Sequence, residues 1–230
     1  MIAQRLGRLV DYNDPCSLGS RFRRRRVRVL LRLIDNVFRK RGAVNVLDVG
    51  GTRGYWDIAD PALLASRNVT ITVLNLPGEV RGRDDKTFRF AEGDGCDLSR
   101  YENNSFDIVH SNSVIEHLGG PGLRLAFAAE VRRLAPSYFV QTPNFWFPVE
   151  PHFMFPVIHW LPEGLRADLL ARMPLGIYRR AESRGDALRA VRAICLLTRR
   201  QMAELFPDGR ILTERLALLP KSLVAVRGPL

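Results

Sequence analysis

Five short apolar runs, each bounded by turn-forming residues, set the strongest limit on how this chain can fold. They are rich in β-branched and aromatic residues and span positions 44–49, 69–76, 88–93, 106–111 and 138–142. Residues 121–136, between the last two runs, carry an apolar stripe at helical spacing that consists of Leu123, Phe127, Val131 and Leu134. Strands that alternate with helices in this way predict an α/β fold, in which helices cover both faces of a mostly parallel sheet.

The size of the chain and its cysteines predict one domain from a reducing compartment. Its 230 residues, 46% of them apolar, are enough to bury a substantial core. Cys16, Cys96 and Cys195 are far apart and form no C-x-x-C pair, so they indicate neither a disulfide framework nor a zinc site. The sequence shows no signal-peptide core and no apolar run near the roughly 20 residues of a membrane span, so we expect a cytoplasmic protein without a transmembrane segment.

Much of the net charge of +11 lies near the N-terminus. Residues 1–42 are predicted to form a basic amphipathic helical segment ahead of the main domain, residues 43–230, with Gly42 ending the helix. Its apolar stripe consists of Val27, Leu30, Leu31, Ile34, Val37 and Phe38. Its basic side chains point mainly away from that stripe, and they include Arg25, Arg28, Arg32 and Lys40.

Three interpretations of this basic face are open. It is solvated while the apolar stripe packs on the domain, or it contacts an anionic membrane surface or anionic substrate, or it binds nucleic acid. We favour the solvated face, because the stripe has enough apolar side chains to pack on the domain and is not needed for insertion. The sequence contains no aromatic base-stacking motif and no helix-turn-helix spacing, which disfavours a nucleic-acid partner.

Residues 46–56, VLDVGGTRGYW, form a glycine-rich turn after a predicted strand. Ligands of such a sheet bind beyond the carboxyl ends of its strands, where this turn is expected. Gly50, Gly51 and Gly54 match neither the dinucleotide-binding pattern nor the P-loop pattern, and no lysine follows them. The turn therefore suits a ligand that needs close backbone approach and a nearby acid, Asp48, more than it suits a phosphate.

Three further stretches are GDGCDL at 93–98, SFDIVHSNSVIEHL at 105–118 and the closing RRQMAELFPDGRILTERLALLPKSLVAVR at 199–227. Together with VLDVGGTRGYW, and in the same order, they resemble the class I S-adenosylmethionine-dependent methyltransferases, in particular the type 11 or methyltransferase-domain group. The resemblance implies a Rossmann-like, doubly wound sheet of seven mostly parallel strands with the last strand antiparallel. It also implies S-adenosyl-L-methionine as the cofactor and methyl transfer as the activity.

The resemblance further implies which residues hold the cofactor. It implies that the methionyl end is bound by Asp48, Gly50, Gly51 and Gly54, and that the ribose is bound by Asn75. It implies that the adenine is bound by Asp94, Gly95 and Cys96, and that the sulfonium side is lined by Ser111 and Asn112. This assignment is chemically reasonable, because a carboxylate balances the ammonium of the ligand and glycines remove the Cβ atoms that would collide with it.

Two residues depart from the family pattern. Thr52 stands where the middle glycine of D-x-G-x-G-x-G is usual, and Asn75 stands where an acid usually accepts hydrogen bonds from both ribose hydroxyls. If Asn75 serves the ribose, Asn75→Asp should bind the cofactor as tightly or more tightly. Alternatively, Asn75 is a turn residue ahead of Pro77, and Asp94 forms an Asx-turn. These departures keep a second function open, that of a non-catalytic protein that only binds the cofactor.

Residues 143–195 are predicted to form a helical and aromatic insertion that caps an apolar substrate pocket. If the acceptor must lose a proton, His152 is the leading candidate for the general base, with Glu150 and His159 behind it. No third ligand stands at a recognisable spacing from Glu150 and His152, so no metal site is expected.

The acceptor expected from this pocket is a small or medium-sized molecule of small-molecule, lipid or glycan type, methylated at oxygen. Methyl transfer from a sulfonium is an in-line displacement with an activated donor, so the protein mainly aligns the acceptor and excludes water. An RNA methyltransferase is the remaining alternative, and the charge of +11 is the observation that favours it.

Overall fold

The computed structural model describes residues 17–229, and a seven-stranded sheet lies at their centre. The strands are β1 Val44–Val49, β2 Val69–Asn75, β3 Phe88–Glu92, β4 Ile108–Asn112, β5 Ser137–Pro143, β8 Arg210–Leu216 and β9 Leu219–Arg227. Their order across the sheet is β3-β2-β1-β4-β5-β9-β8. Strands β1 to β5 run parallel, whereas β9 is antiparallel to both of its neighbours. The prediction of a mostly parallel seven-stranded sheet with an antiparallel last strand is confirmed.

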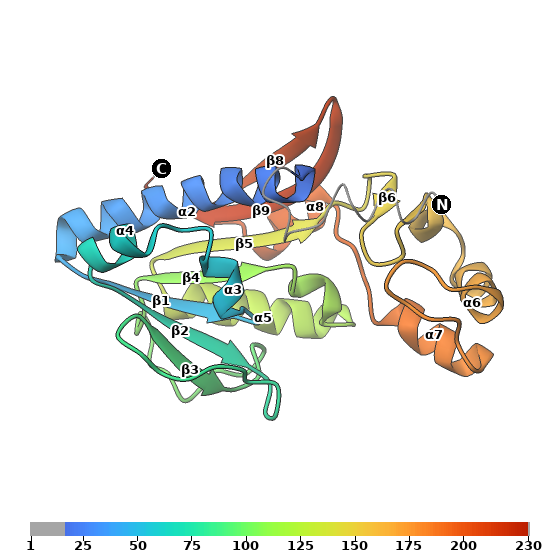
Figure 1. The fold of residues 1–230 in the computed structure, drawn as a ribbon, viewed down its shortest axis with the longest axis horizontal. Helices are drawn as coiled ribbons and strands as arrows, with labels where there is room; N and C mark the ends of the chain where they lie inside the picture. Colours follow the sequence, from blue (N-terminus) through green and yellow to red (C-terminus); the bar gives the residue numbers. More distant parts are fainter. Residues whose placement is uncertain (1–16, 230) are drawn as a thin grey trace.

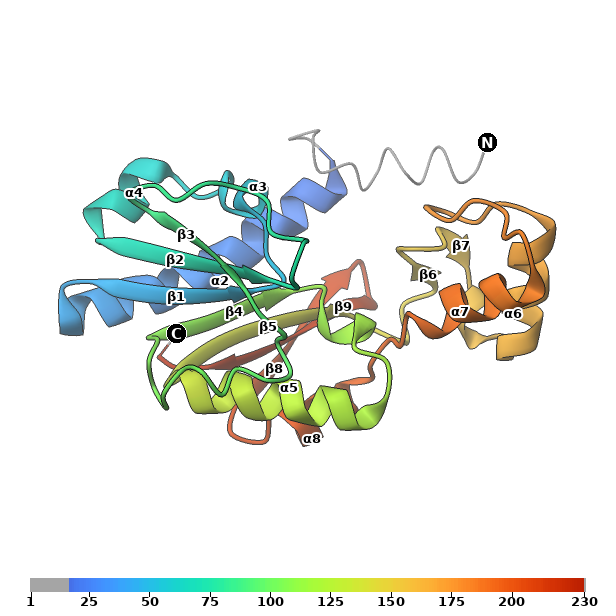
Figure 2. The ribbon, with the colours of Figure 1, turned by 90° about the horizontal axis from the view of Figure 1, so that it is seen from below.

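Helices cover both faces of this sheet (Figures 1 and 2). One face carries α2 Leu18–Arg41, α3 Arg53–Trp56 and α4 Pro61–Ser66, and the other carries α5 Pro121–Leu134 and α8 Arg199–Leu205. The strand order reverses between β1 and β4, which are neighbours in the sheet. In doubly wound sheets, ligands bind beyond the carboxyl ends of the strands at such a reversal.

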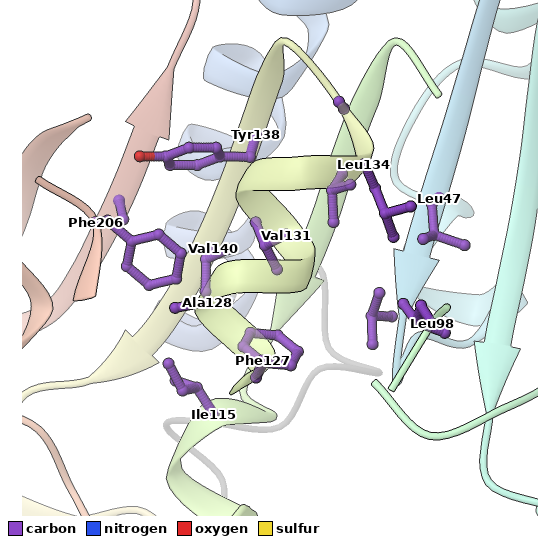
Figure 3. Packing of buried hydrophobic residues seen from close by; sticks show 14 of the residues in the cluster. Leu47, Leu98, Ile115, Phe127, Ala128, Val131, Leu134, Tyr138, Val140 and Phe206 are labelled. Atoms are coloured by element: carbon purple, nitrogen blue, oxygen red, sulfur yellow. The ribbon is translucent and has the colours of Figure 1, made fainter. Parts of the chain in front are cut away.

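The packing of α5 explains why the helical pattern between β4 and β5 was readable in the sequence. Figure 3 shows Phe127, Val131 and Leu134 of this helix in one buried cluster with Leu47 of β1. A fully buried side chain of this kind stabilises the fold by roughly 1.5–3 kcal/mol. Leu123 was predicted on the same stripe but is 51% exposed, because the first turn of α5 lies outside the buried cluster.

Helix α2 lies along the opposite face of the sheet, at the N-terminal end of the described residues. The Ser17 hydroxyl caps its N-terminus, and Gly42 ends it with a φ of +72, as predicted. The arginines predicted to be solvated, Arg25, Arg28 and Arg32, are exposed. The part of the predicted basic segment before residue 17, with Cys16, lies outside the described residues. Across residues 17–229, we find no helix with the length and apolar character needed to cross a membrane.

Residues 143–195 form a lobe beyond the carboxyl ends of the parallel strands (Figures 1 and 2). The lobe contains β6 Val149–Glu150, β7 Phe155–Pro156, the 3-10 helix η2 Ile158–Trp160, α6 Glu163–Arg172 and α7 Arg184–Arg192. It has its own apolar cluster, which includes Phe153, Ile158, Leu170 and Val191. That this lobe is a substrate cap, and that residue 42 is a domain boundary, remain predictions.

Both the first and the last residues of the lobe are hydrogen-bonded near the carboxyl ends of the strands. Phe145 N–H donates to the Leu197 carbonyl over 3.0 Å, which joins the outgoing and returning chain. Cys195 N–H donates to the Glu116 carbonyl over 2.8 Å. Glu116 belongs to a short 3-10 helix, η1 Ile115–His117, that follows β4. The 3-10 helix η1 and the base of the lobe are therefore in contact.

Candidate functional site

The glycine-rich turn joins β1 to α3 at the carboxyl edge of the sheet. Gly50 has a φ of +69, a conformation that favours glycine, and its N–H donates to the Leu74 carbonyl over 2.7 Å. Thr52 has a φ of −138 and a ψ of 149, which is extended backbone that any residue adopts. The demanding backbone angle therefore falls on Gly50, and threonine in place of the middle glycine is accommodated without strain.

Asp48 lies fully buried beneath this turn. Its Oδ2 accepts a hydrogen bond from Trp56 Nε1 at 2.8 Å, and its Oδ1 lies 2.6 Å from His110 Nδ1. Gly51 packs against the same carboxylate, because a Cβ built there would lie 1.8 Å from Oδ2. Asp48 thus ties β1 to β4 and α3 and leaves no room for a side chain at position 51. Its interaction with the ammonium of a cofactor stays a prediction.

Asn75 holds the turn from its other side. It is the last residue of β2, and its Nδ2 donates to the Gly51 carbonyl over 3.0 Å. Because a carbonyl can only accept, the amide nitrogen must face Gly51, and the amide oxygen is directed elsewhere. An aspartate cannot donate this hydrogen bond, so the structure changes the expectation for Asn75→Asp.

We expect Asn75→Asp to weaken the binding of S-adenosylhomocysteine by about tenfold, because a lost hydrogen bond and carboxylate–carbonyl repulsion together cost about 1.4 kcal/mol. Asn75→Ala, which removes the bond without adding the repulsion, serves as the matched control and should lose less affinity. Isothermal titration calorimetry of both variants measures the difference. Binding by Asn75→Asp as tight as that of the unmodified chain would show that a contact of the new carboxylate with the ribose outweighs the lost hydrogen bond to Gly51.

The residues predicted at the adenine follow β3. Asp94 Oδ1 accepts the Cys96 N–H over 2.9 Å, which is the Asx-turn considered as the alternative for this position. A Cβ on Gly95 would lie 2.7 Å from Cγ1 of Val49, so only glycine lets this turn approach the end of β1 so closely. Burial, followed by the charge of Asp94, raises the pKa of Cys96 to about 11, so the thiol is neutral at physiological pH. The adenine contacts themselves stay predictions.

Two polar residues at the end of β4 are occupied by contacts within the protein. The Ser111 hydroxyl donates to the Val49 carbonyl over 3.0 Å, and Asn112 Oδ1 accepts from Arg26 Nη1 over 2.8 Å. Arg26, on α2, is 4% exposed and lies 3.5 Å from a carboxylate oxygen of Glu214. A buried cation from the basic helix therefore reaches the edge of the sheet where the ligand is expected.

A cluster of two acids and two histidines lies where η1 meets the lobe. Glu150 Oε1 is 2.5 Å from His152 Nδ1, while its Oε2 accepts the backbone N–H groups of His152 and Phe153 over 2.9 and 2.6 Å. The rings of His117 and His152 are 4.8 Å apart and nearly perpendicular. Ligand atoms of Glu116, His117 and His152 all lie within 4.8 Å of one another. The lobe thus brings two of the predicted catalytic residues to two residues of η1.

The environment shifts the pKa values in this cluster in different directions. Burial raises the pKa of Glu116 to about 7. Burial alone would lower the pKa of His152, but the hydrogen bond and charge of Glu150, with the charge of Glu116, outweigh it and raise that pKa. Burial and the neighbouring His152 lower the pKa of His117. Clustered groups with perturbed pKa values are typical of functional sites.

His159, the third predicted catalytic residue, is packed inside the lobe. Its Nε2–H donates to the Phe145 carbonyl over 2.8 Å, and Trp160 Nε1 donates to the same carbonyl over 2.9 Å. The side chain is largely buried, and burial lowers its pKa. These contacts give His159 a role in the packing of the lobe, and a catalytic role for it stays a prediction.

Comparison with known proteins bears on the fold around this site. The sequence model of a family described as a methyltransferase domain matches residues 60–137, from the start of α4 to the start of β5. The matched range contains the Asp94 turn, the end of β4 and η1, and the antiparallel β9 completes the sheet as the resemblance implied. The match covers about a third of the chain, and the whole described sheet has the strand order and the antiparallel strand that the resemblance implies. No curated protein matches its sequence.

Three solved structures are similar to this chain at low sequence identity. An O-methyltransferase family protein from Burkholderia thailandensis is 15% identical, with 90% of this chain and 58% of that chain covered and a TM-score of 0.44. An arsenic(III) S-adenosylmethionine methyltransferase from Chlamydomonas reinhardtii is 18% identical, with 80% and 62% covered and a TM-score of 0.48. An S-adenosylmethionine-dependent methyltransferase from Methanosarcina mazei is 15% identical, with 80% and 91% covered and a TM-score of 0.47. The chain spans less than two thirds of the length of the first two.

Three candidate functional residues of this site were not assigned a role from the sequence. Arg26 stands four residues after Phe22 and four before Leu30, so helical spacing already placed it on the buried face of α2. Glu116 and His117 lie in the stretch at 105–118 that carries the family resemblance, but neither received a role in the site. The signal for them is an acid next to a histidine directly after a strand end, where ligands bind.

Proposed function

We propose that this chain is a class I methyltransferase that transfers a methyl group from S-adenosyl-L-methionine to an oxygen atom of a small or medium-sized acceptor. One observation carries the proposal. Gly50 in the cofactor turn packs so closely on Val114 that a Cβ there would lie 2.5 Å from Cγ2 of that valine. Val114 is the N-cap of η1, which supplies Glu116 and His117. The glycine-rich turn proposed for the cofactor and the acid–base cluster proposed for the acceptor are therefore adjacent.

The turn fits this cofactor. The close approaches at Gly51 and Gly95 leave no room for a side chain at these two positions, and Gly50 and Gly54 of the turn are exposed to solvent. Asp48 supplies a buried negative charge for the ligand's ammonium. In the proposal, Asn75 faces the ribose, the 94–96 turn faces the adenine, and the end of β4, with Ser111 and Asn112, faces the sulfonium side. When bound, S-adenosylmethionine supplies a methyl group that is already activated.

His152 is the residue proposed to activate the acceptor oxygen. Glu150 fixes its Nδ1, so Nε2 is the ring atom left to act on an acceptor. Three hydrogen bonds hold Glu150 itself, which keeps the imidazole in one orientation. A positioned group that assists proton removal typically contributes a factor of about 10²–10⁴ in rate.

The lobe favours an acceptor with an apolar part. Large apolar side chains of the lobe are exposed, among them Trp146, Phe155, Trp160 and Ile177. We therefore propose a small-molecule, lipid or glycan-type acceptor. The exposed arginines of α2 are compatible with peripheral contact with an anionic membrane. The non-catalytic alternative loses its main support, because the fold accommodates both Thr52 and Asn75.

An acceptor screen with the full chain tests this proposal. We expect radiolabelled methyl groups to pass from S-adenosylmethionine to a hydroxyl compound among phenols, hydroxylated lipids, glycans and RNA. His152→Ala should lower the rate at least about 100-fold, because the group that assists proton removal is lost, while the affinity for S-adenosylhomocysteine is kept. Glu150→Gln, which keeps an acceptor for Nδ1, is the graded control and should lose less.

Each contrary outcome identifies a different error. Methylation of nitrogen or carbon acceptors alone would contradict the oxygen assignment. Salt-sensitive methylation of RNA would support the nucleic-acid alternative instead. Cofactor binding without transfer to any acceptor class would favour the non-catalytic alternative.

A further inference from the structure

We propose that Glu116, His117 and His152 bind one divalent transition-metal ion of the zinc class beside the acceptor position. The three side chains come from η1 and from the turn between β6 and β7, so the fold of the lobe is needed to assemble them. Their ligand atoms lie within 4.8 Å of one another. Two imidazoles and one carboxylate form a donor set that proteins use for zinc sites with an open coordination position.

The buried carboxylate of Glu116 supplies the first independent observation. The side chain has no exposed surface, and its Oε2 accepts from the Thr142 hydroxyl over 2.9 Å. Its Oε1 has no hydrogen-bond partner in the described part of the chain. Leaving a buried carboxylate oxygen unpaired is costly, and a bound cation would remove that cost.

His152 supplies the second observation, because one of its ring nitrogens, Nδ1, is already bonded to Glu150. The ring of His117 lies 4.8 Å from the ring of His152 and is nearly perpendicular to it. Metal-binding histidines almost always use their second nitrogen in this way, with a carboxylate or a backbone carbonyl fixing the ring. His152 therefore keeps Nε2 for a metal.

The donor set and the spacing also select the metal. Imidazole ligands favour zinc, nickel, copper and iron, whereas magnesium and calcium prefer oxygen ligands. Ligand atoms about 2.1 Å from a tetrahedral zinc ion are about 3.4 Å apart, so the widest pair, within 4.8 Å, must close by up to about 1.4 Å. Rotation of His117, whose side chain is exposed, can supply this movement. Three protein ligands leave a fourth position open.

The role of this metal rests on the proposed function and explains how His152 acts. An acceptor hydroxyl bound at the open position would have its pKa lowered by the cation, and its proton would pass to solvent water. The acceptor oxygen then forms the bond to the methyl carbon while the carbon–sulfur bond breaks and its electron pair stays on sulfur. His152 would serve as a metal ligand oriented by Glu150, and Glu150 would be a positioning residue.

Zinc binding to the tag-free full chain tests the site without relying on activity. After removal of metals with a chelator and dialysis, titration with zinc chloride is expected to show one equivalent per chain, and cobalt chloride should give the visible spectrum of a four-coordinate site. His117→Ala changes an exposed side chain and is not expected to disturb folding. It should weaken zinc binding by at least about 100-fold, as should Glu116→Gln and His152→Ala. Glu150→Gln should weaken it by about 10- to 100-fold.

His159→Gln is the matched control, because it removes an imidazole of the lobe outside the cluster while its amide can still donate to the Phe145 carbonyl, and it should leave zinc binding unchanged. Absence of stoichiometric zinc binding, or equal binding by His117→Ala and the unmodified chain, would overturn the inference. Calorimetry with S-adenosylhomocysteine on the same metal-free protein separates the two proposals. Cofactor binding without zinc binding would contradict the metal site but not the proposed methyl transfer. Zinc binding without cofactor binding would contradict the proposed methyl transfer but not the metal site.

Discussion

Replacing Asp48 by alanine is expected to lower the free energy of unfolding by about 3 kcal/mol and to weaken S-adenosylhomocysteine binding more than tenfold. The carboxylate is fully buried and receives hydrogen bonds from Trp56 and His110, so its removal leaves two buried donors unpaired. Each unpaired donor costs about 1–3 kcal/mol. Denaturant unfolding measures the stability, and calorimetry measures the affinity.

Asp48→Asn separates the shape of this side chain from its charge. The amide fills the same space and keeps one acceptor, so it should lose about half of the stability that Asp48→Ala loses. If the charge of Asp48 balances the ammonium of the cofactor, the affinity should still fall about tenfold, because a charge-assisted contact is worth about 1.5–3 kcal/mol. Unchanged affinity in Asp48→Asn would limit Asp48 to supporting the turn.

Gly51→Ala is expected to be nearly as damaging, although it adds only one methyl group. The new Cβ would lie 1.8 Å from Oδ2 of Asp48. That oxygen cannot move away freely, because Trp56 holds it in a hydrogen bond. The turn itself must therefore shift, at a cost of about 1–3 kcal/mol, and the binding of S-adenosylhomocysteine should be lost with it.

Gly54→Ala is the matched control three residues further on. Its Cβ would meet only Oδ2 of Asp57, at an ordinary contact distance of 3.7 Å. Because alanine favours a helix over glycine, stability should be unchanged or slightly higher. A loss of stability in Gly54→Ala equal to that of Gly51→Ala would contradict the packing described for the turn. A loss of cofactor affinity with stability kept would place the ligand against Gly54.

The sheet was predictable because its signal is local. The run at 44–49 became β1 with the same bounds, since Val44, Val46, Leu47 and Val49 are buried and the glycines of the turn follow directly. The stripe on α5 was predicted one turn too long, because helical spacing shows which side chains share a face but not where the neighbouring core ends. Leu123 lies on the predicted face and is exposed for that reason.

The site was predictable only where a motif carries it. VLDVGGTRGYW located the turn, but it did not show that Asp48 pairs with His110, since that partner lies on β4 and is found only when the strands are aligned. Likewise, the sequence around Glu150 and His152 did not show which other side chains lie beside them in the fold. The base of the lobe folds back on η1 through the Cys195–Glu116 backbone hydrogen bond, which brings Glu116 and His117 to them. Contacts of this kind depend on tertiary packing that no spacing rule encodes.

The binding of S-adenosylhomocysteine to the unmodified full chain is the most direct test of the central claim, that the turn at 50–54 is a cofactor site. Isothermal titration calorimetry is expected to show saturable binding to one site per chain, and Gly51→Ala should abolish it. Absence of saturable binding to a chain that circular dichroism shows to be folded would contradict the account.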